Sequence, residues 1–204
     1  MTSLFLKVRV IGSSTTPASM MVQAQWVAER AGLQRFRTEQ PPYSILNRGL
    51  EREVLPMAQE YGMGVMVWGP FGQGLLTGRV RKGGENDLKR TQFSRHLTDE
   101  RRIDVVEQLI PLAEEAGLPM THLAMAFAVA HPGVTAALLG PRTMEHLDDL
   151  LVGVDVELSD DIIDRIDEIV PPGTDVTALD QEYKPPALLD TALRRRPAGL
   201  RSAT

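Results

Sequence analysis

The sequence has no cysteine among its 204 residues. Disulfides and thiolate nucleophiles are therefore excluded, and the composition fits a reducing compartment. No apolar run approaches the roughly 18 residues that a membrane helix requires, and the N-terminus lacks the apolar core of a signal peptide. We therefore expect a cytoplasmic protein with no membrane-embedded segment.

An excess of positive charge is also missing, because the formal net charge is −5. Such a chain has no general attraction to nucleic acid or anionic lipid, and we expect neither as a partner. The local run Arg194 to Arg196 is interpreted as a solvated end of the chain. The 43% hydrophobic content is ordinary for a protein that buries a core.

Histidine is scarce, and its four copies do not form a metal or triad pattern with nearby carboxylates. We interpret each histidine as a solvated or capping residue, and we predict no metal site. The four are His96, His122, His131 and His146.

Strand patterns alternate with helix patterns along the chain. Strands are predicted at residues 4–11, 36–40, 64–68 and 134–139, and helices at 17–31, 50–61, 103–113 and 119–130, with shorter ones after Thr143 and Ser159. This alternation predicts an α/β fold with parallel strands over residues 1–170. Residues 78–94 are expected to be a lid, a binding loop or a disordered insert, and residues 171–204 an irregular tail.

The ends of the predicted strands carry small, polar or glycine residues, as sites in parallel α/β folds do. Trp68 ends the third strand and leads directly into a glycine-rich loop. An aromatic residue at such a position either packs in the core or stacks on a flat ligand, and the residues themselves do not decide between these roles.

Four segments together resemble the aldo-keto reductases: VRVIGSS, TEQPPYSILNR, GVMVWGPFGQGLLTGR and HPGVTAALLGPRTMEHLDDLL. They follow in that family's order over roughly residues 7–170. The resemblance implies a partial (β/α)8 TIM barrel containing strands five to eight with their helices. It also implies NADPH-dependent reduction of aldehydes and ketones to alcohols.

The resemblance assigns cofactor contacts by position. Ser13, Ser14 and Gln40 would bond the nicotinamide carboxamide, and Trp68 would stack on the nicotinamide ring. The following loop would run along the pyrophosphate through its backbone amides; its residues are Gly69, Pro70, Phe71, Gly72, Gln73, Gly74 and Leu75. The adenosine 2'-phosphate would lie at Gly140, Arg142 and Thr143.

The sequence departs from the family in two respects. His146 and Leu150 occupy the positions of the usual adenine-binding glutamine and asparagine. His146 is still expected to bind the cofactor, at a phosphate or the base edge, whereas leucine cannot hydrogen-bond. The family's catalytic Asp, Tyr, Lys and His come from strand units two to four, so we predict no catalytic residue here. Tyr43 follows a strand end, but we expect it to pack beside the loop rather than replace the acid.

Three accounts of the chain remain open. It is a truncated reductase that is inactive alone, a self-associating half-barrel that keeps only nucleotide binding, or a module that completes another chain. We favour the first, because Met1 directly precedes a strand that the family places in mid-chain. A half-barrel would have open edges, through which it could self-associate, and it would act on a small carbonyl substrate only when completed.

Overall fold

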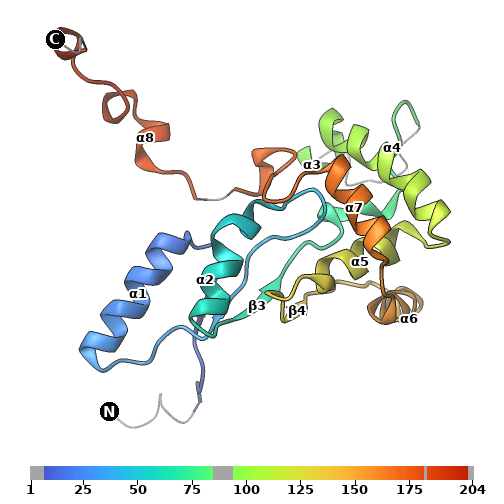
Figure 1. Ribbon diagram of the computed structural model, residues 1–204, viewed down its shortest axis with the longest axis horizontal. Coiled ribbons are helices and arrows are strands. Elements are labelled where there is room, and N and C mark those ends of the chain that lie inside the picture. Colours follow the sequence, from blue (N-terminus) through green and yellow to red (C-terminus); the bar gives the residue numbers. More distant parts are fainter. Residues whose placement is uncertain (1–6, 85–93, 182, 202–204) are drawn as a thin grey trace.

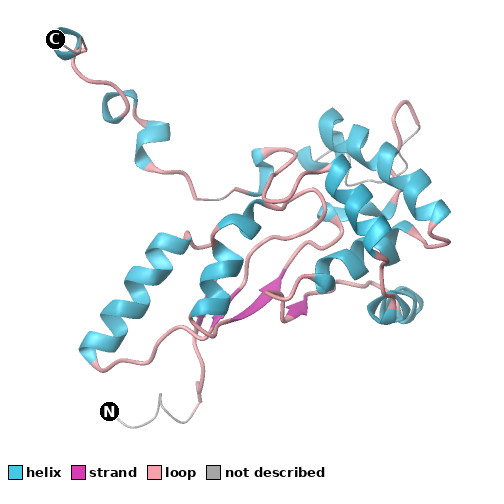
Figure 2. Ribbon diagram, in the orientation of Figure 1, coloured by secondary structure: helices cyan, strands magenta, loops and turns pink. Residues whose placement is uncertain are grey.

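The computed structural model describes residues 7–84, 94–181 and 183–201. Its four short strands form one parallel sheet in chain order, each strand pairing with the next (Figures 1 and 2). They are β1 (Gly12–Ser13), β2 (Thr38–Glu39), β3 (Gly64–Val67) and β4 (Ala136–Ala137). The predicted α/β fold is confirmed, and parallel neighbours in chain order are consistent with part of a barrel.

Helices follow the strands and cover the sheet. The α-helices are α1 (Ala18–Ala31), α2 (Val54–Glu60), α3 (Arg95–Thr98), α4 (Glu100–Glu115), α5 (Met120–Ala130), α6 (Met144–Val152), α7 (Asp160–Ile169) and α8 (Pro186–Leu189). Short 3-10 helices are η1 (Gly49–Arg52), η2 (Gly72–Thr77), η3 (Gly153–Asp155), η4 (Ala178–Asp180), η5 (Thr191–Leu193) and η6 (Ala198–Leu200). Among the described residues, no helix combines the length and the apolarity needed to cross a membrane.

Most helix ends lie where the sequence predicts them. α1 begins directly after Pro17 and ends before Gly32, whose φ of 64° suits glycine. The helix predicted at residues 50–61 is instead divided into η1 and α2, because Glu53 has a non-helical φ of −136°. The division brings the start of η1 close to the C-terminal part of the chain.

The first strand differs from its predicted position at residues 4–11. Residues 4–6 lie outside the described residues, and Val8 and Val10 are more than half exposed. Pairing begins where the Ile11 carbonyl accepts from the Arg37 amide at 2.9 Å, and the strand itself is Gly12–Ser13. The apolar side chains that suggested a strand thus precede the paired residues, on the outer side of the sheet.

The core lies between the sheet and helices α2, α4, α5 and α7. Val65 and Val67 of β3 are fully buried, as are Leu123 of α5 and Ile166 of α7. In contrast, α1 stands at one end of the molecule (Figure 1) and exposes Trp26 at 56%. A hollow of about 430 Å³ beside α1 has an apolar lining that includes Ile11, Met20, Val27 and Leu33.

The segment after α7 is attached to the body at first and then leaves it. The Val176 amide donates to the Leu46 carbonyl at 3.0 Å, and Asp180 is buried. Residues 183–201 extend away from the body as an arm that contains α8, η5 and η6 (Figure 1). The predicted boundary at residue 171 is not tested by this arrangement.

The predicted loop at residues 78–94 is described only at its two ends, since residues 85–93 lie outside the described residues. Its first part is held to α4, where Arg81 and Lys82 pair with Glu107 and Asp104 at 2.8 and 2.6 Å. The lid, binding-loop and disorder interpretations therefore stay predictions.

Candidate functional site

The ends of β1 and β2 bring three predicted cofactor contacts together. The Ser14 hydroxyl donates to the Gln40 carbonyl at 2.8 Å. The Ser13 hydroxyl donates to the carboxylate of Glu39, which also accepts from the Thr16 amide at 3.0 Å. Glu39 is fully buried and has no predicted role, so sequence reasoning missed the residue that positions Ser13.

Trp68 lies at the end of β3, where the sequence places it. Its amide donates to the Pro41 carbonyl at 3.0 Å, and its carbonyl accepts from the Tyr43 amide at 3.2 Å. These bonds extend the parallel pairing beyond β3, with Pro42 facing Trp68 across the bridge. The residue is partly exposed, as a stacking platform at a strand end requires, and stacking itself stays a prediction.

The loop after Trp68 forms tight turns instead of an extended strand-to-helix connection. Gly74 has a φ of 103°, which only glycine adopts readily, and Gln73 takes a left-handed φ of 61°. The amides of Gly72, Gly74 and Leu76 donate to carbonyls within the loop. These three amides are therefore engaged in shaping the loop, and a pyrophosphate would be met by the others.

A cavity of about 320 Å³ joins the far end of this loop to the segment before α6. Its lining comes from both predicted segments and from α5, and includes Phe71, Thr77, Arg79, Thr121, Gly140, Arg142, His146 and Leu150. Two arginine side chains in one cavity favour an anionic ligand. Of the predicted residues, Phe71, Gly140, Arg142 and His146 line this cavity, and Ser13, Ser14, Gln40 and Trp68 lie at the strand ends. The lining does not include Thr143 or the other predicted loop residues, which are Gly69, Pro70, Gly72, Gln73, Gly74 and Leu75.

Two residues near this cavity differ from the prediction, because Thr143 does not line it and Arg79 does. Thr143 is exposed and caps α6, since its hydroxyl accepts from the His146 amide at 3.2 Å. Arg79 has no predicted role, although it follows Gly78 directly at the end of the glycine-rich loop. The signal that could have predicted a role for Arg79 is its position, because a basic residue directly follows the glycine-rich loop.

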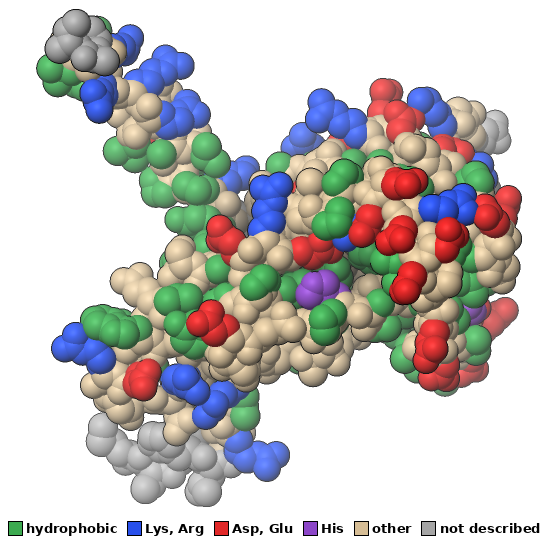
Figure 3. Space-filling view, in the orientation of Figure 1, with side chains coloured by type: hydrophobic (Ala, Val, Ile, Leu, Met, Phe, Trp, Pro, Cys, Tyr) green, Lys and Arg blue, Asp and Glu red, His purple; other side chains and the backbone are tan. Residues whose placement is uncertain are grey.

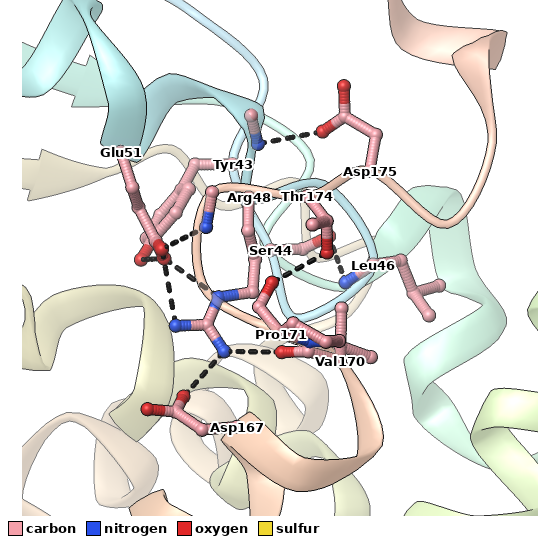
Figure 4. Close-up of polar contacts among 12 residues, drawn as sticks. Tyr43, Ser44, Leu46, Arg48, Glu51, Asp167, Val170, Pro171, Thr174 and Asp175 are labelled. Carbon is pink, nitrogen blue, oxygen red and sulfur yellow. Dashed lines mark hydrogen bonds and ion pairs between the residues drawn. The ribbon is translucent and has the colours of Figure 1, made fainter.

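Tyr43 is held in a buried polar network between η1 and the end of α7 (Figure 4). It is 1% exposed, and its hydroxyl donates to Glu51 at 2.8 Å. Arg48 also donates to Glu51 and to Asp167, at 2.8 and 2.6 Å. Burial, followed by the Glu51 charge, raises the pKa of Tyr43 well above its usual value, so this phenol keeps its proton near neutral pH. The predicted packing role is confirmed.

The interpretation of every histidine as solvated or capping is wrong for two of them. His96 Nε2 lies 2.7 Å from a carboxylate oxygen of the buried Asp180, and His122 Nε2 lies 3.2 Å from that of Asp149. Those partners are 84 and 27 residues away along the chain, so no local spacing indicates them. His131 caps as predicted, because its Nδ1 accepts from the Gly133 amide at 3.0 Å.

In the described part of the chain, no group of three potential ligands could hold a metal ion.

Comparison with known proteins finds the same family over the length that contains these groups. The sequence profile described as "Aldo/keto reductase family" matches residues 7–171. An uncharacterized oxidoreductase, YrpG, from Bacillus subtilis is 38% identical over 165 residues, which cover 81% of this chain and 50% of YrpG. Protein tas from Escherichia coli is 31% identical over 166 residues, covering 80% of this chain and 48% of that protein.

A probable voltage-gated potassium channel subunit beta from rice is 30% identical over 170 residues, covering 78% of this chain and 51% of that protein. The chain thus spans about half the length of the curated relatives it matches. The parallel strands in chain order agree with the (β/α)8 barrel that the profile implies. By its sequence over residues 7–171, the chain belongs to the aldo/keto reductase family.

Proposed function

We propose that this chain supplies the NADP(H)-binding half of an aldo-keto reductase, with β1 to β4 corresponding to strands five to eight of the barrel. The observation that carries the proposal is the cavity that brings Phe71 together with Arg142 and His146 from the other predicted segment. The resemblance to the family assigns these residues to the same nucleotide, and in the structure they line the same cavity.

The residues of the cavity fit the adenosine end of NADP(H). Arg79 and Arg142 would hold phosphate oxygens by charge-assisted hydrogen bonds. Phe71 and Leu150 provide apolar surface for a base, and His146 is exposed at the rim. The Asp149 carboxylate also lines the cavity and would oppose an anion there; its Oδ1 lies 3.2 Å from His122 Nε2.

The chemistry follows from what each group would do. The bound nicotinamide would supply a hydride for the carbonyl carbon of the substrate. Ser14 and Gln40 would orient its carboxamide, and Trp68 would present one ring face. The proton for the carbonyl oxygen would come from the other half of the barrel, because Tyr43 is buried and bonded to Glu51.

The cofactor assignment predicts that NADPH quenches the fluorescence of Trp68. The chain has one other tryptophan, Trp26, on the exposed side of α1, which provides a matched control. We expect Trp26→Phe to keep most of the quenching and Trp68→Phe to remove most of it, because a ring stacked on the nicotinamide should be quenched more strongly than a distant one. Quenching that survives in Trp68→Phe but not in Trp26→Phe contradicts this site.

The assignment also predicts selectivity for the 2'-phosphate. Arg142→Ala should weaken NADPH binding by roughly tenfold or more, and NADH binding much less, because one charge-assisted contact is lost. Calorimetric titration with both cofactors measures this, and Arg95→Ala, an exposed arginine of α3, is the control. Equal losses for NADPH and NADH would remove the 2'-phosphate role of Arg142.

A second candidate function is a non-catalytic NADP-binding module that completes a partner chain. Among the described residues, β1 and β4 each pair with one strand only, which leaves two edges for further parallel strands. The two functions make the same prediction for the isolated chain in a turnover assay with NADPH and a panel of aldehydes, and they differ only in the effect of co-expression. The isolated chain should be inactive in both cases, so turnover that disappears on Trp68→Ala would refute both. Activity gained on co-expression with strand units one to four of a reductase favours the reductase half.

A further inference from the structure

The arm at residues 183–201 combines basic and apolar side chains that the body does not cover. The arm contains four arginines, Arg194, Arg195, Arg196 and Arg201, but only one acidic residue, Asp190. Leu189 and Leu193 are 72% and 62% exposed. Arg195, Arg196 and Arg201 surround a hollow of about 320 Å³, and within the described residues no carboxylate lies within salt-bridge distance of them.

The outer face of α6 and η3 has the opposite charge and the same exposed apolar content. Asp148 and Asp155 are exposed, and helical spacing puts them on one face with Leu151 and Val152. Those two apolar side chains are 51% and 62% exposed. Acidic side chains also gather over this side of the molecule in the space-filling view (Figure 3). We name this surface the α6 face.

The two surfaces are complementary in both respects. Each leaves large apolar side chains in water, where a contiguous exposed patch usually marks an interaction site. Their charges are of opposite sign, which would orient the contact and speed association. The arm is basic, whereas the molecule as a whole has a formal net charge of −5.

We propose that the arm of one molecule docks on the α6 face of a second copy of this chain. The arm and α6 lie at opposite ends of the molecule (Figure 1), so the contact joins two different surfaces. Such a head-to-tail contact produces rings or open chains of subunits instead of a two-fold dimer. The proposal is independent of the cofactor site, because neither surface includes a residue assigned to NADP(H).

The test is the oligomeric state of the full chain, measured by sedimentation velocity from about 1 to about 100 μM. We expect concentration-dependent association that weakens about tenfold between about 50 and about 500 mM NaCl, because exposed charge pairs are screened. Arg195→Glu with Arg196→Glu should raise the dissociation constant about tenfold or more, and so should Asp148→Lys with Asp155→Lys. Arg95→Glu with Arg101→Glu, exposed residues of α3 and α4, changes the net charge by the same amount as the arm variant and should leave association unchanged.

The decisive variant carries both reversals in one chain. If the arm binds the α6 face, the fourfold variant regains association with the polarity of the contact reversed. A mixture of the two double variants should also associate, because one keeps the native arm and the other the native α6 face. A chain that is monomeric throughout this range, or association that no charge reversal affects, overturns the proposal. If association is lost in the arm variant and is not recovered in the fourfold variant, the α6 face is not the docking surface. The same follows if the arm folds back on its own molecule, which would make the monomer more compact at every concentration.

Discussion

The positively charged side chain of Arg102 is fully buried and has few polar partners. Its guanidinium donates to Asp180 and Asn47 through Nη2 and to Thr177 through Nε. In the described part of the chain, its buried Nη1 has no hydrogen-bond partner. Asp180 is therefore the essential counter-charge, and it also accepts from His96.

Removing that counter-charge should be costly. Asp180→Ala leaves a buried cation without its anion, and we expect a loss of about 3–5 kcal/mol in the free energy of unfolding. Urea denaturation measures this loss. Glu168→Ala, which removes an exposed carboxylate from α7, is the control and should change stability by less than about 0.5 kcal/mol. A loss below about 1 kcal/mol in Asp180→Ala would mean that Arg102 finds other compensation.

At the scale of elements, the attachment of residues 78–84 to α4 depends on Glu107. This carboxylate accepts from Arg81 at 2.8 Å and from the Lys82 amide at 2.9 Å. The Arg81 hydrogen bond, followed by the Lys82 amide, lowers the pKa of Glu107 to about 2. Because the folded pKa lies below the unfolded one, the contribution to stability is complete above about pH 4.5 and is lost as the pH falls towards 2.

The segment should therefore loosen in acid and in a Glu107 variant. We expect exchange of the Lys82 amide hydrogen, corrected for its intrinsic rate, to accelerate as the pH falls from about 4.5 to about 2. Glu107→Gln should give about threefold or greater acceleration already at neutral pH. Glu114→Gln, an exposed acid on the same helix, serves as the control. Unchanged exchange in Glu107→Gln would show that other contacts hold the segment.

Elements with strong local signals were predictable, and those decided by distant contacts were not. Pro17 and Gly32 fixed both ends of α1, and the apolar run of β3 lies where it was predicted. The first strand was misplaced because apolar side chains do not reveal which residues find a pairing partner. The pairing of His96 with Asp180 was invisible because 84 residues separate them. The predicted cofactor contacts rest on the resemblance to the family, and Arg79 was identified only because it lines the cavity.

At the scale of the whole molecule, the apolar hollow beside α1 is the surface that the other half would cover if the chain is half of a barrel, as proposed above. Met20→Lys with Val27→Lys places two charges in it, and both residues are about half exposed, so the fold should tolerate them. We expect the binding of an apolar fluorescent dye, and aggregation in high salt, to fall to roughly half. Val22→Lys, on α1 but outside the lining of the hollow, should change neither. Equal effects of the two variants would point to a general charge effect.

The network around Arg48 also sets an order in time. Its guanidinium donates to the Val170 carbonyl at 2.7 Å, and the neighbouring Gly49 amide donates to Asp175, partners 122 and 126 residues further along the chain. At about 5–20 residues per second, a ribosome needs about 6–25 seconds to make the stretch between Arg48 and Val170. Until then Arg48 has Glu51 beside it but neither Asp167 nor Val170. The contacts of η1 with this region therefore stay incomplete until α7 and the residues up to Asp175 have left the ribosome, so a segment made later decides when an earlier one is fully held.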